Sequence, residues 1–173
     1  MSGEPLPEEL APPPCLPGAE RPLTPGEIAL VQSVFGDAVD CAPVRIRRRK
    51  WFPFQPANVV MAPCGHLHFH RGSALYQDDF AGAPIGLQGL FIHEMTHVWQ
   101  TQRKGRWYLP LMRHPLCRYD YALRPGWTLG RYGIEQQAEI VRHAFLLDRG
   151  WRVPGAPPLA SYDGILPFGR ISG

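Results

Sequence analysis

The sequence predicts an α+β domain in which a few short strands accompany two long helices. Apolar residues recur at helical spacing over about residues 85–103 and 132–149, with enough apolar surface to bury one side of each helix. Runs of strand-forming residues at 44–54, 58–62 and 67–70 are separated by proline and glycine turns. The 20 prolines and 18 glycines among 173 residues are typical of short elements joined by many loops.

Length and composition are those of one globular domain. At 45% apolar and 19% charged residues, the chain can bury a core without disulfides or metals as staples. A net charge of +3 is too small to imply a polyanionic partner. The four cysteines include no C-x-x-C pair, which favours reduced thiols; one or two disulfides in an exported protein are the alternative.

Residues 1–26 are expected to be a proline-rich flexible segment, mobile, extended or draped on a single domain of residues 27–173. The segment holds eight prolines and almost no bulky apolar residues, so it buries too little to offset its ordering entropy. A partner-binding proline tract is the alternative. No apolar run approaches membrane-spanning length and no signal region is recognisable. We therefore expect a cytoplasmic protein with no membrane partner, with leaderless export as the alternative.

A helix is expected to begin at Thr24-Pro25-Gly26-Glu27. Thr24 would be the N-cap and Pro25 the first helical residue, while Glu27 would complete a capping box. Gly36 would end this helix.

The first strand-forming run is strongly basic, with cations at Arg45 and from Arg47 to Lys50. A charge-protected edge strand is favoured over a nucleic-acid surface, so no nucleic-acid partner is expected. His66, His68 and His70 would share one face of a later strand. A second metal site there is the alternative to plain strand residues.

His93 and His97 lie four residues apart in the first long helix, so their imidazoles project from one face, one turn apart. Both can then reach a single Zn²⁺ at about 2.0–2.1 Å. Glu94 is too close to His93 to be a third ligand. It can instead take a proton from the zinc-bound water, which is the metallopeptidase interpretation of His-Glu-x-x-His. A metal-free pair of core histidines is the alternative, and it would leave buried polar atoms to satisfy.

Glu135 and Glu139 supply what this site still lacks. A catalytic zinc has three protein ligands and an open fourth position. The two acids are four residues apart on one helix face, so one can bind metal while the other holds a ligand imidazole by its far N–H. His143 can hydrogen-bond Glu139 or act as a catalytic donor; the first role is favoured.

The connection from 105 to 131 is long for a compact domain, and such loops are usually functional. We expect it to cover or flank the cleft. Its tyrosines and the one that follows are candidates to donate a hydrogen bond to a developing oxyanion, and no spacing rule selects among Tyr108, Tyr119, Tyr121 and Tyr132.

Together, the two motifs resemble the gluzincin clan of zinc peptidases, in which HExxH is followed by a Glu-x-x-Ala-(Asp/Glu) helix. The resemblance implies a minimal zincin-like fold, with a small twisted β-sheet packed on the HExxH helix and on a second, Glu-bearing metal helix. It also implies that Glu135 is the third zinc ligand and that Glu139 orients a histidine. Many relatives have Asp where this chain has Glu139, so the geometry of that outer contact differs.

A narrower resemblance covers about residues 40–150. HEMTHVWQ together with EQQAEIV is similar to small alphaproteobacterial proteins labelled "Vgr-related". It is also similar to HE-x-THV-x-Q metallopeptidase-like domains found near polymorphic-toxin and secretion modules. These motifs are specific for a zinc site and much less so for a substrate.

The predicted function is that of a zinc-dependent metallopeptidase acting on a peptide or protein substrate. His93, His97 and Glu135 would bind Zn²⁺, and Glu94 would activate the zinc-bound water. The substrate would pair with the sheet edge near the HExxH helix. The alternative is a zinc-stabilised interaction or accessory module, associated with secretion or a mobile element, with little or no hydrolysis. An open groove beside the metal would favour the enzyme, and a plugged one the module.

Overall fold

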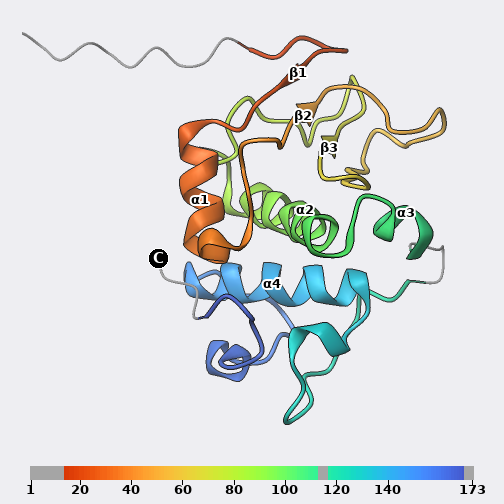
Figure 1. The fold of residues 1–173 in the computed structure, drawn as a ribbon. Coiled ribbons are helices and arrows are strands. Elements are labelled where there is room, and N and C mark those ends of the chain that lie inside the picture. Colours follow the sequence, from red (N-terminus) through yellow and green to blue (C-terminus); the bar gives the residue numbers. More distant parts are fainter. Residues whose placement is uncertain (1–13, 113–116, 170–173) are drawn as a thin grey trace, which may run out of the picture.

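The computed structural model describes residues 14–112 and 117–169 (Figure 1). Its strands and helices are β1 (Glu20–Arg21), α1 (Pro25–Phe35), β2 (Ile46–Arg47), β3 (Leu67–His68), α2 (Ile85–Lys104), α3 (Tyr108–Met112) and α4 (Ile134–Asp148). Short 3-10 helices lie at Gly36–Ala38, Leu129–Arg131 and Leu159–Tyr162. Within these residues no helix combines the length and apolar character needed to cross a membrane.

The strands form a three-stranded sheet in the order β1-β2-β3. β1 pairs antiparallel with β2, and β2 pairs parallel with β3, placing Ile46 opposite Leu67. Met61 adds an isolated antiparallel bridge to His68. The strands expected over 44–54 and 58–62 are thus much shorter than predicted. Pro53 and Pro56 interrupt this region, and proline donates no ladder hydrogen bond.

α2 and α4 pack against each other across the middle of the molecule, and α2 lies between α4 and the sheet (Figure 1). The helices approach closely at Gly89, where an added Cβ would lie 3.0 Å from a Leu146 methyl carbon. On the other side of α2, Phe91 stacks on Phe80 with ring centres 5.1 Å apart, and Phe80 stacks on Phe69 beside β3. α2 is therefore held on both sides, so its central turns are rigidly placed.

The predicted start of α1 is confirmed. Thr24 Oγ1 accepts a hydrogen bond from the Glu27 N–H at 3.0 Å, and Glu27 Oε2 accepts one from the Thr24 N–H at 2.9 Å. The helix ends at Phe35, and Gly36 follows with a φ of 53°. The four cysteines are free thiols, in agreement with the prediction.

Residues 14–26 of the proline-rich segment lie on the domain, and residues 1–13 are outside the described part. Arg21 of β1 anchors them by donating to both carboxylate oxygens of Glu27, each at 2.8 Å. Glu27 is fully buried and also accepts a hydrogen bond from the Phe80 N–H at 2.9 Å. One carboxylate thus joins the N-terminal segment, α1 and the loop before α2.

Replacing Glu27 with Gln should lower the free energy of unfolding by about 3–5 kcal/mol, because the buried Arg21 would lose its counter-charge. Urea unfolding followed by circular dichroism measures this change. Glu20→Gln is the matched control, since Glu20 pairs with Arg47 and Arg49 at the surface. The control should cost less than about 1 kcal/mol. Equal costs for the two variants would contradict the role given to Glu27.

Candidate metal centre

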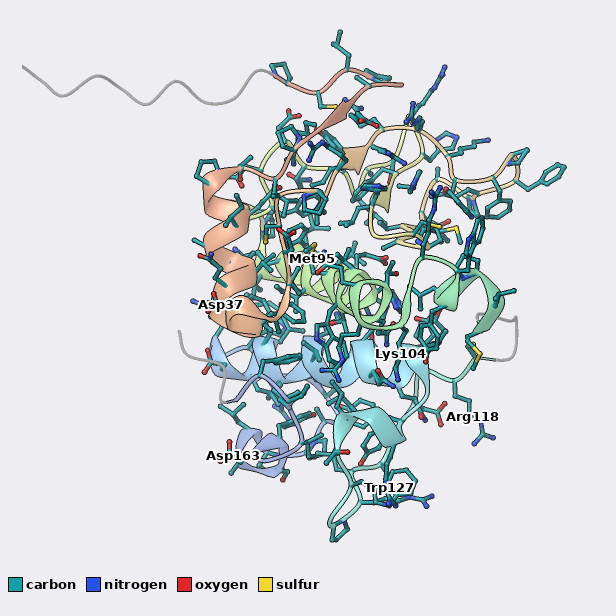
Figure 2. The ribbon with its side chains drawn as sticks, viewed as in Figure 1. Asp37, Met95, Lys104, Arg118, Trp127 and Asp163 are labelled. Carbon is teal, nitrogen blue, oxygen red and sulfur yellow. The ribbon has the colours of Figure 1, made fainter. Side chains whose placement is uncertain are left out.

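Three potential metal ligands converge where α2 packs on α4. His93 and His97 come from successive turns of α2 and Glu135 from the first turn of α4, and their ligand atoms all lie within 4.8 Å of one another. Figure 2 shows side chains filling the space between these two helices. The three residues are 5%, 2% and 0% exposed. The folded chain therefore brings together the three residues that the sequence assigned to one ion.

The distances within this group fit a zinc coordination shell. Glu135 Oε2 lies 3.2 Å from His97 Nε2 and 3.4 Å from His93 Nε2. Two ligands bound tetrahedrally at zinc distances are about 3.3–3.6 Å apart. The two distances to Glu135 are close to this spacing, and all three ligand atoms lie within 4.8 Å of one another.

The far nitrogens of both imidazoles face hydrogen-bond acceptors. His93 Nδ1 is 2.7 Å from Glu139 Oε1, and His97 Nδ1 is 2.8 Å from Gln100 Oε1. A neutral imidazole carries one N–H; when that hydrogen lies on Nδ1 and is donated to these acceptors, the lone pair on Nε2 can bind a metal ion. Two such lone pairs and the Glu135 carboxylate then face one another in a buried space. This set is repulsive until a metal ion or additional protons neutralise it.

Gln100 and Gln137 are site residues that the sequence analysis did not single out. Gln100 Nε2 donates to Ile134 O and to Gln137 Oε1, both at 3.0 Å. These bonds direct Oε1 of Gln100 toward His97. The only sequence signal for Gln100 is its place in the HE-x-THV-x-Q pattern, three residues after His97. No local signal indicates Gln137.

Glu139 lies at the centre of a hydrogen-bonded chain that leads away from the ligands. Its Oε2 is 3.1 Å from His143 Nε2, in agreement with the favoured role of His143. His143 Nδ1 is 2.8 Å from the Tyr121 hydroxyl, which is 2.6 Å from the Tyr162 hydroxyl. Burial alone would raise the pKa of Glu139, but the hydrogen bonds to His143 and His93 outweigh it and hold that pKa well below its usual range.

The same contacts change the proton affinity of His93. Burial tends to lower the pKa of this imidazole, but hydrogen bonds to Glu135 and Glu139 outweigh burial and raise it to about 9. Without metal, His93 therefore carries an extra proton at neutral pH. That proton occupies the nitrogen that a metal ion requires.

Glu94 is buried beside the ligands without belonging to their group. It is 4% exposed, and within the described residues no donor hydrogen-bonds its Oε2. A buried carboxylate oxygen without a protein donor is available to accept a proton from a molecule that enters the site.

A cavity of about 530 Å³ lies beside His97. Its lining is mostly apolar and comes from the loop between β2 and β3, from α3 and from the chain after α3: Trp51, Phe52, Met61, Ala62, Pro63, Leu109, Pro110, Cys117 and Tyr119. The connection expected to flank the cleft thus contributes one wall of this cavity. Residues 113–116 of that connection lie outside the described part.

Tyr119 is the candidate tyrosine that lines this cavity. Its ring stacks beside His93, with centres 6.4 Å apart and an angle of 17°. The Tyr121 hydroxyl instead contacts His143, and the Tyr132 hydroxyl accepts a hydrogen bond from the Arg124 N–H. Tyr108 lines two neighbouring cavities.

The structure does not support a second metal site at the histidine triplet. Within the described residues, the one group of metal-binding side chains is that of His93, His97 and Glu135. His68 is buried against Trp51, and burial is the main reason that its pKa is lowered to about 4.

Comparison with known proteins identifies relatives of this chain. No family model matches it. It is 45% identical over 138 residues to the type VI secretion system spike protein VgrG2b of Pseudomonas aeruginosa, an alignment that covers 74% of this chain and 13% of the spike protein.

A solved structure matches more completely. The chain resembles the effector domain of Pseudomonas aeruginosa VgrG2b with a TM-score of 0.69 and 39% identity, covering 84% of this chain and 83% of that domain. The narrower resemblance to Vgr-related proteins is thereby confirmed, whereas the wider one to the gluzincin clan remains a prediction. Since identity and coverage are high over both domains, this chain belongs to the family of the VgrG2b effector domain.

Proposed function

We propose that this chain is a zinc-dependent peptidase that acts as an effector domain in type VI secretion. The observation that carries the catalytic part is the convergence of two imidazoles from α2 and the Glu135 carboxylate from α4, with Glu94 buried on the same turns of α2. Similarity to the VgrG2b effector domain supports the secretion part and carries no information about hydrolysis. The zincin-like fold belongs to the same proposal, supported by the position of α2 between α4 and the sheet.

His93, His97 and Glu135 would hold the metal. When bound, zinc polarises a scissile carbonyl and lowers the pKa of water to about 7. Glu94 accepts the proton of the attacking water and later passes it to the leaving amine. Tyr119 lines the cavity beside His97, and its ring stacks beside His93. It is therefore the tyrosine best placed to hydrogen-bond the substrate carbonyl.

The substrate is proposed to lie extended in the cavity beside His97. Met61 bridges to the outer strand β3, and the chain continues through Ala62 and Pro63 along the cavity wall. An extended peptide can add to such an edge through main-chain hydrogen bonds.

The second candidate is a zinc-stabilised accessory module without hydrolysis. The similarity of this chain to part of a secretion spike protein favours a secretion role for such a module, because a role in secretion does not require catalysis. An open groove beside the metal site would favour the enzyme, and the cavity of about 530 Å³ beside His97 supports that proposal.

Replacing Glu94 with Gln should abolish most hydrolysis while the protein keeps one zinc ion, because the acceptor of the water proton is lost and the ligands remain. General bases contribute about 10²–10⁴-fold in rate. Cleavage of an unbiased peptide library followed by mass spectrometry measures the rate, and elemental analysis measures the zinc.

Asp148→Asn is the matched control, because it removes a carboxylate from the far end of α4. It should leave cleavage and zinc content unchanged. An active Glu94→Gln variant would refute the assigned base. Zinc in the wild type without any cleavage would favour the accessory module, and a protein that takes up no zinc would refute both candidates.

Zinc binding at pH 7 should release about one proton from His93, because the raised pKa of about 9 keeps that imidazole charged in the metal-free protein. The apparent zinc affinity should then fall by up to about tenfold per unit as the pH decreases below about 9. Calorimetry in two buffers of different ionisation enthalpy counts the released protons. Zinc binding at pH 7 without proton release would contradict the charged state of His93.

Replacing Glu139 with Gln should weaken zinc binding by about 10–100-fold, because the carboxylate that orients His93 and makes it more basic is lost. His143→Asn should have a smaller effect in the same direction, since His143 acts only through Glu139. Competition with a chromogenic chelator measures both dissociation constants. If Glu139→Gln and the Asp148→Asn control bind zinc equally, Glu139 does not position His93.

A further inference from the structure

The segments that wall the cavity beside His97 also carry an unusual concentration of exposed apolar side chains. Among the described residues, these segments hold most of the exposed large apolar side chains, and six of them define what we call the aromatic rim: Trp51, Phe52, Phe54, Trp107, Leu111 and Met112. Single exposed apolar residues are normal on protein surfaces, whereas a concentration of them marks an interaction site.

One half of the aromatic rim stands on a fixed turn. Gln55 at the base of this turn is 2% exposed. Its Oε1 accepts a hydrogen bond from the Trp51 N–H at 2.7 Å, and its Nε2 donates to His68 O of β3 at 2.9 Å. Phe54 is 85% exposed beyond this anchor. The rings therefore project from a turn that is tied to the sheet edge.

The other half stands on α3 and the residue before it. Trp107 and Leu111 are four residues apart and are 62% and 80% exposed, whereas Leu109 is buried toward the cavity. The Arg106 guanidinium lies 5.5 Å from the centre of the Trp107 ring. Figure 1 shows α3 and the loop between β2 and β3 on the same side of the molecule.

The charge of these two segments has a single sign. Residues 45–65 and 99–112 hold eight of the chain's 18 lysines and arginines and none of its 15 aspartates and glutamates. Arg47 and Arg49 are paired with Glu20 of β1. Within the described residues, no acidic group pairs with Lys50, Lys104 or Arg106. A partner with both apolar and anionic groups would therefore complement the rim.

We propose that the aromatic rim docks this domain on the surface of an anionic phospholipid membrane. Such a surface offers phosphates to lysine and arginine above acyl chains that accept aromatic and aliphatic side chains. The rim residues stand on the tips of two projecting segments, a shape that suits a plane. Nucleic acid is less suitable, because Leu111 and Met112 offer no ring for base stacking.

This docking would turn the cavity beside His97 toward the membrane. Membrane docking differs from the expectation, made from the sequence, that the protein has no membrane partner. That expectation depended only on the lack of a membrane-spanning segment. Peripheral docking needs no such segment. The proposal is independent of hydrolysis, because lipid binding is measured without any peptide substrate.

Co-sedimentation of the full chain with lipid vesicles tests the proposal. The protein should bind vesicles containing phosphatidylglycerol at least about tenfold more than pure phosphatidylcholine vesicles, and less at high salt. The double variant Trp107→Ser/Leu111→Ser should lose at least about tenfold in binding. Trp151→Ser is the matched control, since Trp151 is also exposed, at 53%, but lies after α4. It should bind like the wild type.

A second variant, Lys50→Glu/Lys104→Glu, separates charge from apolar insertion and should also lose binding. Circular dichroism confirms that each variant is folded. Four outcomes would overturn the proposal: no binding of the wild type to anionic vesicles, wild-type binding by the Trp107→Ser/Leu111→Ser variant, wild-type binding by the Lys50→Glu/Lys104→Glu variant, or an equal loss in Trp151→Ser. Rim-dependent binding of a single-stranded oligonucleotide without vesicle binding would overturn it in favour of nucleic acid.

Discussion

The structure depends on three electron-pair donors that are buried together between α2 and α4. Two imidazole nitrogens and one carboxylate lie within 4.8 Å of one another in a space with almost no exposure to water. Such a set is stable only when a cation or added protons neutralise it. A bound ion would link two turns of α2 to the first turn of α4. Metal affinity and the packing of the two helices are therefore coupled, because ligands held this way in the folded chain are not assembled in the unfolded one.

The two histidines are held by different kinds of partner. His93 contacts the carboxylate of Glu139, whose charge is stabilised by His143, so its imidazole is made strongly basic. His97 contacts the neutral amide of Gln100, which orients the ring without adding charge. Proton and metal therefore compete at His93, and the contact with Gln100 sets the direction of the His97 ring. This division follows from the outer contacts rather than from the ligand motif.

The elements that the sequence predicted well are those set by local spacing. Ligands at His93 and His97 and the capping box of Thr24 and Glu27 depend on residues three or four apart, and the structure places both as expected. The strands were predicted poorly, since each pairs with a partner at least 20 residues away and prolines interrupt the runs. The contacts from His143 through Tyr121 to Tyr162, and the Gln100–Gln137 amide pair, join distant segments, so no spacing rule indicates them.

The aromatic rim and the metal site differ in the exposure to water that each requires, although they lie close together in the molecule. The ligand set requires exclusion of water, because buried charges interact more strongly in a low dielectric. The rim exposes large apolar side chains to water, which lowers solubility unless a partner covers them. The central turns of α2 carry the ligands His93 and His97, and its last turn carries Arg103 and Lys104 near the favourable C-terminal end of the helix, just before the half of the rim on α3. A domain that binds a surface through its rim would bring that surface to the cavity beside His97, so docking and access to the metal site would be a single event.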